Sequence, residues 1–220
     1  GLGDVYKRKT VGNQALARRD EPRLLGDVIL EDAKRVETVR MAAGPEVELF
    51  IDANCSLDLY HARQLCQMIE PFHIEFFEEP ITQNDIRHMA ELRSQTTIRL
   101  ACGQNEGQAY RFRDMMIAGA VDIIQPNVAI TGGFTQCQKI AALANSFNIS
   151  VDNGGAWPFF NQHLQAGLSN GGLVEYHYSS VEVCKRLYIG LPEPKQGWLR
   201  MTDTPGLGFE LNIAALSHFE

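Results

Sequence analysis

Short apolar runs alternate with stretches of helical spacing along most of this chain. The runs are rich in Val, Ile, Leu and Phe, and they predict strands at residues 47–52, 73–78, 98–104, 121–125, 148–152 and 172–177. The stretches between them predict helices at residues 30–43, 57–69, 84–94, 107–119, 132–146 and 159–168. Ser56 is the predicted N-cap of the second helix. One strand, one helix and two loops take roughly 23–30 residues, so the alternation predicts repeated β/α units with a parallel sheet.

A polar residue ends or directly follows most of the predicted strands. These residues are Asp52, Glu78, Gln104, Asn127, Asp152 and Glu175, and successive members are 23 to 26 positions apart. Side chains placed once per unit at the C-termini of parallel strands converge on one rim of a closed barrel. The spacing therefore predicts an active site on that rim.

The two ends of the chain depart from this alternation. Residues 1–10 form a predicted partial strand, and residues 11–25 are polar and Arg-rich and predict an extended loop. The segment after residue 177 is rich in Pro and Gly and predicts an irregular tail with a short helix near residues 213–219. Seven strands result, whereas a closed barrel of this type has eight. We therefore expect a further strand before Gly1 or a complement from another segment, and a chain that is the C-terminal part of a longer polypeptide.

The composition argues against a nucleic-acid-binding protein and against a membrane protein. The 220 residues carry a formal net charge of −7, whereas a nucleic-acid surface needs clustered Lys and Arg to offset phosphate charge. No apolar run reaches the roughly 18–20 residues of a membrane span. The five cysteines form no Cys-x-x-Cys pair, as expected for free thiols in a reducing cytosol. We expect a cytoplasmic enzyme that acts on a small molecule, with no nucleic-acid or membrane partner.

Four short motifs follow one another at the ends of predicted strands and in the C-terminal tail. They are Ile51-Asp52-Ala53-Asn54, Phe77-Glu78-Glu79-Pro80, Ala101-Cys102-Gly103-Gln104-Asn105-Glu106 and Pro205-Gly206-Leu207-Gly208. On these motifs the chain resembles the mandelate racemase subgroup of the enolase superfamily over residues 1–211. The resemblance implies an α/β fold, a TIM-type (β/α)7β barrel that is incomplete at its N-terminal side, because the α+β capping domain and the first strand are absent from this chain.

The same resemblance implies a division of the chain and an assembly. Residues 1–190 would form the barrel domain with strands two to eight, and residues 191–220 a C-terminal segment that packs on the capping domain. The protein would be a homo-oligomer.

In this family, three carboxylates on consecutive strands hold Mg²⁺, which binds the substrate carboxylate. Asp52 and Glu78 fall on the first two ligand positions. The third falls on Gln104, where the family usually has Glu, so the site would lose one negative charge and bind the ion less tightly. Glu106 lies two residues further on and would share the face of Gln104 if the strand continued. Gln104 is favoured by position, and Glu106 stays open as the alternative.

The resemblance also implies a base that removes the proton α to the carboxylate. Members of the family commonly carry Lys-x-Lys on the second strand, and Lys7-Arg8-Lys9 fits this pattern. Alternate residues of a strand face the same way, so Lys7 and Lys9 would enter the barrel together. Their mutual repulsion and a nearby metal would lower the pKa of one ammonium group toward the working range of a base.

Substrate contacts are implied at the remaining strand ends. Racemases of the subgroup use an Asp-His pair where this chain has Asn127 and Gly154. Racemisation through that pair is not expected unless Asp152 or His177 takes over its role. Asp152 ends a strand and could serve as an acid, a substrate ligand or a cap. Glu175 aligns with a carboxylate that hydrogen-bonds the substrate in some members, and His177 would share its face. Asn54 and Asn127 complete the predicted substrate-binding set.

These expectations favour one reaction and leave two alternatives. One base is enough to start the dehydration of an aldonate or aldarate to a 2-keto-3-deoxy acid, whereas racemisation needs a base on each face. The predicted function is therefore Mg²⁺-dependent dehydration of an acid sugar. The alternatives are a racemase or epimerase of a carboxylate, and a barrel that has lost catalysis and keeps a binding role.

Overall fold

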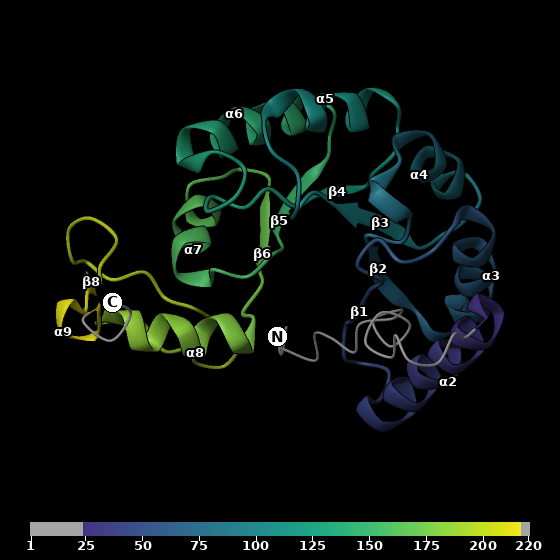
Figure 1. Ribbon diagram of the computed structural model, residues 1–220, viewed down its shortest axis with the longest axis horizontal. Helices are drawn as coiled ribbons and strands as arrows, with labels where there is room; N and C mark the ends of the chain where they lie inside the picture. The colour runs from purple at the N-terminus through teal and green to yellow at the C-terminus, as the bar shows by residue number, and fades with distance from the viewer. Residues whose placement is uncertain (1–23, 217–220) are drawn as a thin grey trace. The chain divides into compact units, whose positions relative to one another are not determined.

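The computed structural model of the protein describes residues 24–216, so the predicted strand at residues 1–10 lies outside the described range. The described residues fall into two compact units, the first with residues 24–102 and 114–123 and the second with residues 103–113 and 124–216. In each unit, strands alternate with helices along the chain (Figure 1).

Three parallel strands form the sheet of the first unit: β1 (Leu49–Asp52), β2 (Ile74–Glu78) and β3 (Arg99–Cys102). β2 lies between the other two, and its Glu78 is the register partner of Asp52 in β1 and of Ala101 in β3. The strands are buried over most of their length, as their apolar composition requires of a parallel sheet covered by helices. The sheet therefore brings Asp52 and Glu78 to one edge.

Helices α2 (Leu25–Ala43), α3 (Leu59–Ile69) and α4 (Ile86–Arg93) alternate with these strands, and short 3₁₀ turns lie at Glu70–Phe72 and Thr82–Asn84. α3 buries Ala62, Leu65, Cys66 and Ile69, which is the spacing of an apolar helix stripe. Each of α3 and α4 begins at an Asp whose side chain accepts a backbone N–H, Asp58 from His61 and Asp85 from His88.

Two sequence predictions for this unit were wrong in detail. The N-cap of α3 is Asp58 and not Ser56, because Leu57 is drawn into a bridge with Ile81 and the helix begins two residues later than predicted. α2 begins at Leu25 rather than at residue 30, since Val28 and Ile29 are each 1 % exposed and extend the buried stripe toward the N-terminus. Both differences follow from tertiary packing that propensity does not encode.

The second unit contains β5 (Ser150–Asn153) and β6 (Gly171–Val174), which pair in parallel, and the end of β4 (Ile123–Ile124). Its helices are α6 (Gly133–Ser146), α7 (Pro158–Ala166) and α8 (Tyr178–Leu187). An antiparallel pair of β7 (Tyr188–Ile189) and β8 (Glu210–Leu211) follows, and then α9 (Ile213–Leu216). α5 (Ala109–Ile117) contributes residues to both units.

The region after residue 177 is more regular than the sequence predicted. α8 was missed because only Val181 and Cys184 of its ten residues are buried, and this stripe is too narrow to stand out. An aromatic cluster holds the following segment in place: the ring of Phe209 lies 5.1 Å from Tyr188 and 5.4 Å from Phe160, between ring centroids. The helix predicted near residues 213–219 is α9, and its predicted end lies outside the described residues.

The α/β class is confirmed, and each strand and helix predicted between residues 30 and 177 is present, with boundaries shifted by a few residues. The predicted helix at residues 30–43 is part of a longer one, and the strand predicted at residues 98–104 ends at Cys102. None of the helices between Leu25 and Leu216 has the length and apolar composition of a membrane span.

Candidate functional site

The carboxylates of Asp52 and Glu78 occupy paired positions at the C-terminal ends of β1 and β2. Asp52 is 3 % exposed and Glu78 is 6 % exposed, so both lie in a low-dielectric environment. Asn54 orients the first of them: its backbone N–H donates to Oδ1 of Asp52 at 2.8 Å, and its side-chain Nδ2 donates to Oδ2 at 2.9 Å. The predicted substrate residue Asn54 is thus in contact with the first predicted metal ligand.

The backbone beside this carboxylate pair is strained. Asn54, Cys55, Glu79 and Asn84 have φ values of 45°, 57°, 43° and 49°, in the left-handed region that residues with a side chain rarely adopt. Hydrogen bonds hold these loops, since Cys55 N–H donates to the carbonyl of Glu79 at 2.8 Å and Glu79 N–H donates to that of Ala101 at 2.9 Å. Strained residues that the surrounding structure fixes concentrate at functional sites.

The electrostatics of the same edge are dominated by acidic groups. Burial raises the pKa of the Cys55 thiol to about 12, with a further contribution from the negative charge of Glu79 and a smaller one from Asp52. Glu79 is fully buried and its Oε1 accepts a hydrogen bond from Nδ2 of Asn84 at 2.9 Å. A negative potential at the ends of β1 and β2 favours a bound cation.

The donor chemistry of the first unit fits a hard divalent cation. Two carboxylates on adjacent strands supply the oxygen ligands that Mg²⁺ prefers. Within residues 24–216, no cluster of three or more His, Cys, Asp and Glu side chains has the arrangement of a metal site. Asp52 and Glu78 could supply two ligands, and a third would have to be an amide oxygen, water or substrate.

Gln104 and Glu106 belong to the second unit, after the end of β3. The argument that they share a strand face is wrong, because β3 ends at Cys102 and Glu106 N–H donates to the carbonyl of Gly103 in a turn. Gly103 has a φ of 127°, and a Cβ there would lie 2.6 Å from the ring of Phe112, so the turn requires glycine. Glu106 Oε2 accepts from Nε of Arg111 at 3.0 Å, whereas Gln104 is buried at 4 % exposure.

Asn127 and Asp152 are engaged with the backbone of the second unit. Nδ2 of Asn127, a fully buried side chain, donates to the carbonyls of Gly154, Gly155 and Ala156 at 2.7, 3.0 and 3.0 Å. Asp152 Oδ1 accepts the N–H of Leu173 in β6 at 2.7 Å. The three roles open to Asp152 stay predictions.

Glu175 and His177 follow the end of β6, so the expectation that they share one strand face is wrong. Glu175 is 2 % exposed, and its Oε2 accepts the N–H of Ala156 at 3.0 Å. His177 is instead the N-cap of α8, where its Nδ1 accepts the N–H of Ser180 at 3.3 Å. The substrate roles of both residues stay predictions.

Three further residues bear on the site: two that the sequence predicted and one that it missed. Lys7 and Lys9, the predicted bases, lie outside the described residues. Asn161 was not singled out from the sequence, since it lies inside a helical stretch with no motif around it. Its Nδ2 donates to the carbonyl of Ala156 at 2.9 Å, and its Oδ1 accepts the N–H of Val128 at 3.0 Å.

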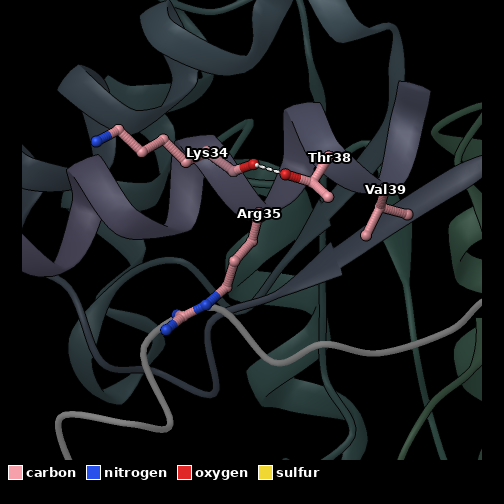
Figure 2. Close-up of a pocket in the computed structure, with 4 residues that line it drawn as sticks. All are labelled: Lys34, Arg35, Thr38 and Val39. Atoms are coloured by element: carbon pink, nitrogen blue, oxygen red, sulfur yellow. Dashed lines mark hydrogen bonds between the residues drawn. The ribbon is translucent and has the colours of Figure 1, made fainter. Parts of the chain in front are cut away.

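A separate pocket of about 170 Å³ lies on α2 and is lined by Lys34, Arg35, Thr38 and Val39 (Figure 2). Arg35 forms ion pairs with Glu31 and Asp32 of the same helix. Thr38 Oγ1 donates to the carbonyl of Lys34 at 2.7 Å. The pocket contains none of the residues predicted for the site.

The chain is similar to proteins of known class. A family model described as enolase C-terminal domain-like matches residues 10–215. L-rhamnonate dehydratase from Saccharopolyspora erythraea is 30 % identical over 187 residues, which cover 81 % of this chain and 48 % of that protein. Arabinonate dehydratase from Saccharolobus solfataricus is 27 % identical over 194 residues, covering 86 % and 52 % respectively.

Solved structures agree with these sequence matches. The 3,6-anhydro-D-galactonate cycloisomerase from Zobellia galactanivorans superposes with a TM-score of 0.81 at 30 % identity, over 87 % of this chain and 55 % of that one. L-talarate dehydratase from Polaromonas sp. JS666, complexed with Mg and L-glucarate, gives 0.79 at 28 % identity, over 86 % and 51 %. The chain spans about half the length of the curated relatives that it matches.

Proposed function

Because the chain belongs to the enolase C-terminal domain-like family, we propose that it is the barrel portion of a Mg²⁺-dependent acid-sugar dehydratase. In this proposal the strands described above belong to a (β/α)7β barrel, with residues 191–220 packing on a capping domain. The substrate is an aldonate or aldarate, and the product is a 2-keto-3-deoxy acid.

One observation carries the proposal. The buried carboxylates of Asp52 and Glu78 are register partners at the C-terminal ends of adjacent parallel strands, where such folds place their chemistry. Relatives named as dehydratases of sugar acids, with L-rhamnonate and arabinonate among their substrates, give the reaction class.

The chain's own residues take distinct roles. Asp52 and Glu78 would hold Mg²⁺, and Asn54 keeps the Asp52 carboxylate oriented through its two hydrogen bonds. When bound, the ion would supply positive charge against the charge that develops on the substrate carboxylate. Gln104 remains the predicted third ligand by sequence position.

The reaction itself needs a base and an acid. Lys7 or Lys9 would take the proton from the carbon α to the carboxylate, and the electron pair left behind would expel the β-hydroxyl, which leaves as water after protonation. The resulting enol then rearranges to the 2-keto acid. Glu175 would contact the substrate, and the residue that protonates the leaving hydroxyl is not assigned.

Calorimetric titration with Mg²⁺ tests the metal site directly. We expect binding in the millimolar range or tighter to the wild-type chain, and loss of binding in Asp52→Asn and Glu78→Gln. Glu46→Gln is a control, since Glu46 is an exposed acid in the loop before β1. Absence of binding to the wild-type chain at millimolar Mg²⁺ would instead support the barrel without catalysis.

A product assay separates the reactions. Wild-type protein with Mg²⁺ is incubated with a panel of aldonic and aldaric acids in deuterated water. Formation of a 2-keto acid supports dehydration, whereas deuterium at the α carbon with every hydroxyl retained supports the racemase alternative.

The inactive barrel is favoured by one set of observations. Gln104 and Asn127 are neutral where this chain's resemblance calls for carboxylates, and Asn127 is occupied by backbone carbonyls. If Mg²⁺ binds but no acid sugar in the panel reacts, the binding role becomes the better account.

A further inference from the structure

The backbone N–H and the backbone carbonyl of Ala156 are each hydrogen-bonded to side chains of the second unit. Its N–H donates to Oε2 of Glu175 at 3.0 Å, and its carbonyl accepts from Nδ2 of Asn127 at 3.0 Å and from Nδ2 of Asn161 at 2.9 Å. Asn127 follows β4, Glu175 follows β6 and Asn161 lies in α7. One residue of the loop between β5 and α7 therefore links three separate elements.

The backbone of this loop is in an unfavourable conformation. Gly155, Ala156 and Trp157 have φ values of 74°, 70° and 60°, so three successive residues are left-handed and two of them carry a side chain. Residues with a Cβ adopt this region at a free-energy cost, and they remain there only where the surroundings fix them. The hydrogen bonds to Ala156 are the contacts that can do so.

The side-chain amide of Asn127 is hydrogen-bonded to this loop and to its own. Its Nδ2 also donates to the carbonyls of Gly154 and Gly155, and its Oδ1 accepts the N–H of Ala129 at 2.9 Å. The side chain is fully buried, and a Cβ on Gly155 would lie 3.2 Å from its Nδ2. Both polar atoms of the Asn127 side chain are thus hydrogen-bonded to backbone groups.

We propose that Asn127 is a positioning residue: through Ala156 it fixes the N–H that orients the carboxylate of Glu175. The inference rests on the proposed function, in which Glu175 meets the substrate. Only an amide suits this place, because a carboxylate has no hydrogen to donate and would face three carbonyl oxygens. Asn127 therefore acts on the substrate through Glu175 and does not act as an acid or a base.

Amide hydrogen exchange at Ala156, followed by NMR, tests the proposal without any activity. Asn127→Ala should speed the exchange of this amide at least tenfold relative to amides in α6. Asn127→Asp keeps the size of the side chain but removes the donor, and at neutral pH it should speed the exchange at least as much.

Asn170→Ala is the matched control. Asn170 also donates its Nδ2 to two backbone carbonyls of the second unit, those of Ala141 and Ile149, both at 3.1 Å. Its loss should leave the exchange of Ala156 within twofold of wild type. If Asn127→Ala also leaves it within twofold, the proposal is wrong.

A second pair of variants tests the proposal if Asn127→Ala alone does not fold. Ala156→Gly removes the conformational cost of the positive φ and keeps the backbone N–H and carbonyl that make the three hydrogen bonds. Asn127→Ala in this background should still speed the exchange of the residue-156 amide tenfold over Ala156→Gly alone, and an unchanged rate there would again overturn the proposal.

Activity gives an independent readout. In the dehydration assay, Asn127→Ala and Glu175→Ala should lower kcat/KM by similar factors, and the double variant should lose no more than either alone. Multiplied losses in the double variant would contradict action through Glu175. If the wild-type chain dehydrates no substrate, the proposed function fails, while the exchange experiment still decides whether Asn127 positions Ala156.

Discussion

Asp52 and Glu78 stand opposite each other on two adjacent parallel strands, with 3 % and 6 % of their surfaces exposed. Negative charges on two neighbouring carboxylates repel each other, and a bound cation would relieve this repulsion. A cation that binds only the folded state would add to its stability by mass action. In the proposed function, the register of β1 and β2 would therefore affect metal binding, and metal binding would affect stability.

Mg²⁺ should raise the melting temperature of the wild-type chain. An ion present at a hundredfold excess over its Kd stabilises the folded state by about 2.7 kcal/mol. Thermal unfolding with increasing MgCl₂ measures the shift, and NaCl at equal ionic strength controls for screening. Asp52→Asn should show no shift beyond this salt control, and a shift equal to that of wild type would contradict the assignment.

The third Mg²⁺ ligand can be identified by adding a negative charge at Gln104 and removing one at Glu106. Gln104→Glu should tighten Mg²⁺ binding by about tenfold, which is about 1.4 kcal/mol, because it adds a negative oxygen donor. Glu106→Gln should leave the affinity unchanged, since Glu106 is paired with Arg111. Calorimetry on both variants decides the question, and weaker binding in Glu106→Gln would favour the alternative ligand.

The alkylation rate of the Cys55 thiol should depend on the charge of the groups beside it. With a pKa of about 12, this thiol is protonated at neutral pH and should react slowly with iodoacetamide, faster as the pH rises toward that value. Mg²⁺ at Asp52 would offset negative charge and accelerate the reaction at constant pH. Mass spectrometry of the Cys55 peptide gives the rate, and Mg²⁺-free buffer with EDTA gives the baseline. Equal rates with and without saturating Mg²⁺ would count against a cation at this edge.

Substitution of Asp58 and of Ser56 should affect stability differently, because Asp58 is the N-cap of α3. Asp58→Ala removes the acceptor of the His61 N–H and should lower the free energy of unfolding by about 1 kcal/mol. Ser56→Ala should be close to neutral, because its buried Oγ has no hydrogen-bond partner among the described residues. Urea denaturation compares the two variants, and a larger loss in Ser56→Ala would restore Ser56 as the cap.

Gly172 should be indispensable to the contact that Asp152 makes. A Cβ at residue 172 would collide with Oδ1 of Asp152, whereas a Cβ at Gly107 would meet no atom within 4 Å. The Asp152 carboxylate would swing away from the added methyl group, so Gly172→Ala should cost about 1 kcal/mol through the lost hydrogen bond from Leu173, and Gly107→Ala much less. Asp152→Ala in the same chain should relieve part of the loss, and strict additivity of the two changes would contradict the collision.

Acid should weaken the start of α4. The backbone N–H of His88 donates to Asp85 at 2.9 Å and lowers the pKa of its carboxyl below the ordinary value. A group with a lowered folded-state pKa stabilises the protein above its unfolded-state pKa, and this contribution is lost as the pH falls through the folded value. Asp85→Asn should flatten the stability profile below about pH 4. Urea unfolding across this range checks it, and an unchanged slope would exclude Asp85.

The sequence by itself determined the order of elements between residues 30 and 177 and the C-terminal ends of β1 and β2. Apolar runs of four to six residues can only be buried strands here, and Asp52 and Glu78 end two of them. Because the carboxyl ends of neighbouring parallel strands meet at one edge, their proximity followed from the alternation alone. The four motifs added the family, which the match over residues 10–215 confirms.

Tertiary structure decided what each polar side chain does. Leu57 pairs with Ile81 and moves the start of α3 to Asp58, and α8 forms on a stripe of two buried residues. Asn127 holds the loop at Ala156, although its spacing marked it only as a strand-end residue. Spacing along the chain determines which strand end carries a polar residue. The hydrogen-bond partners of that residue come from segments distant in sequence, and they are brought to it only when the chain packs.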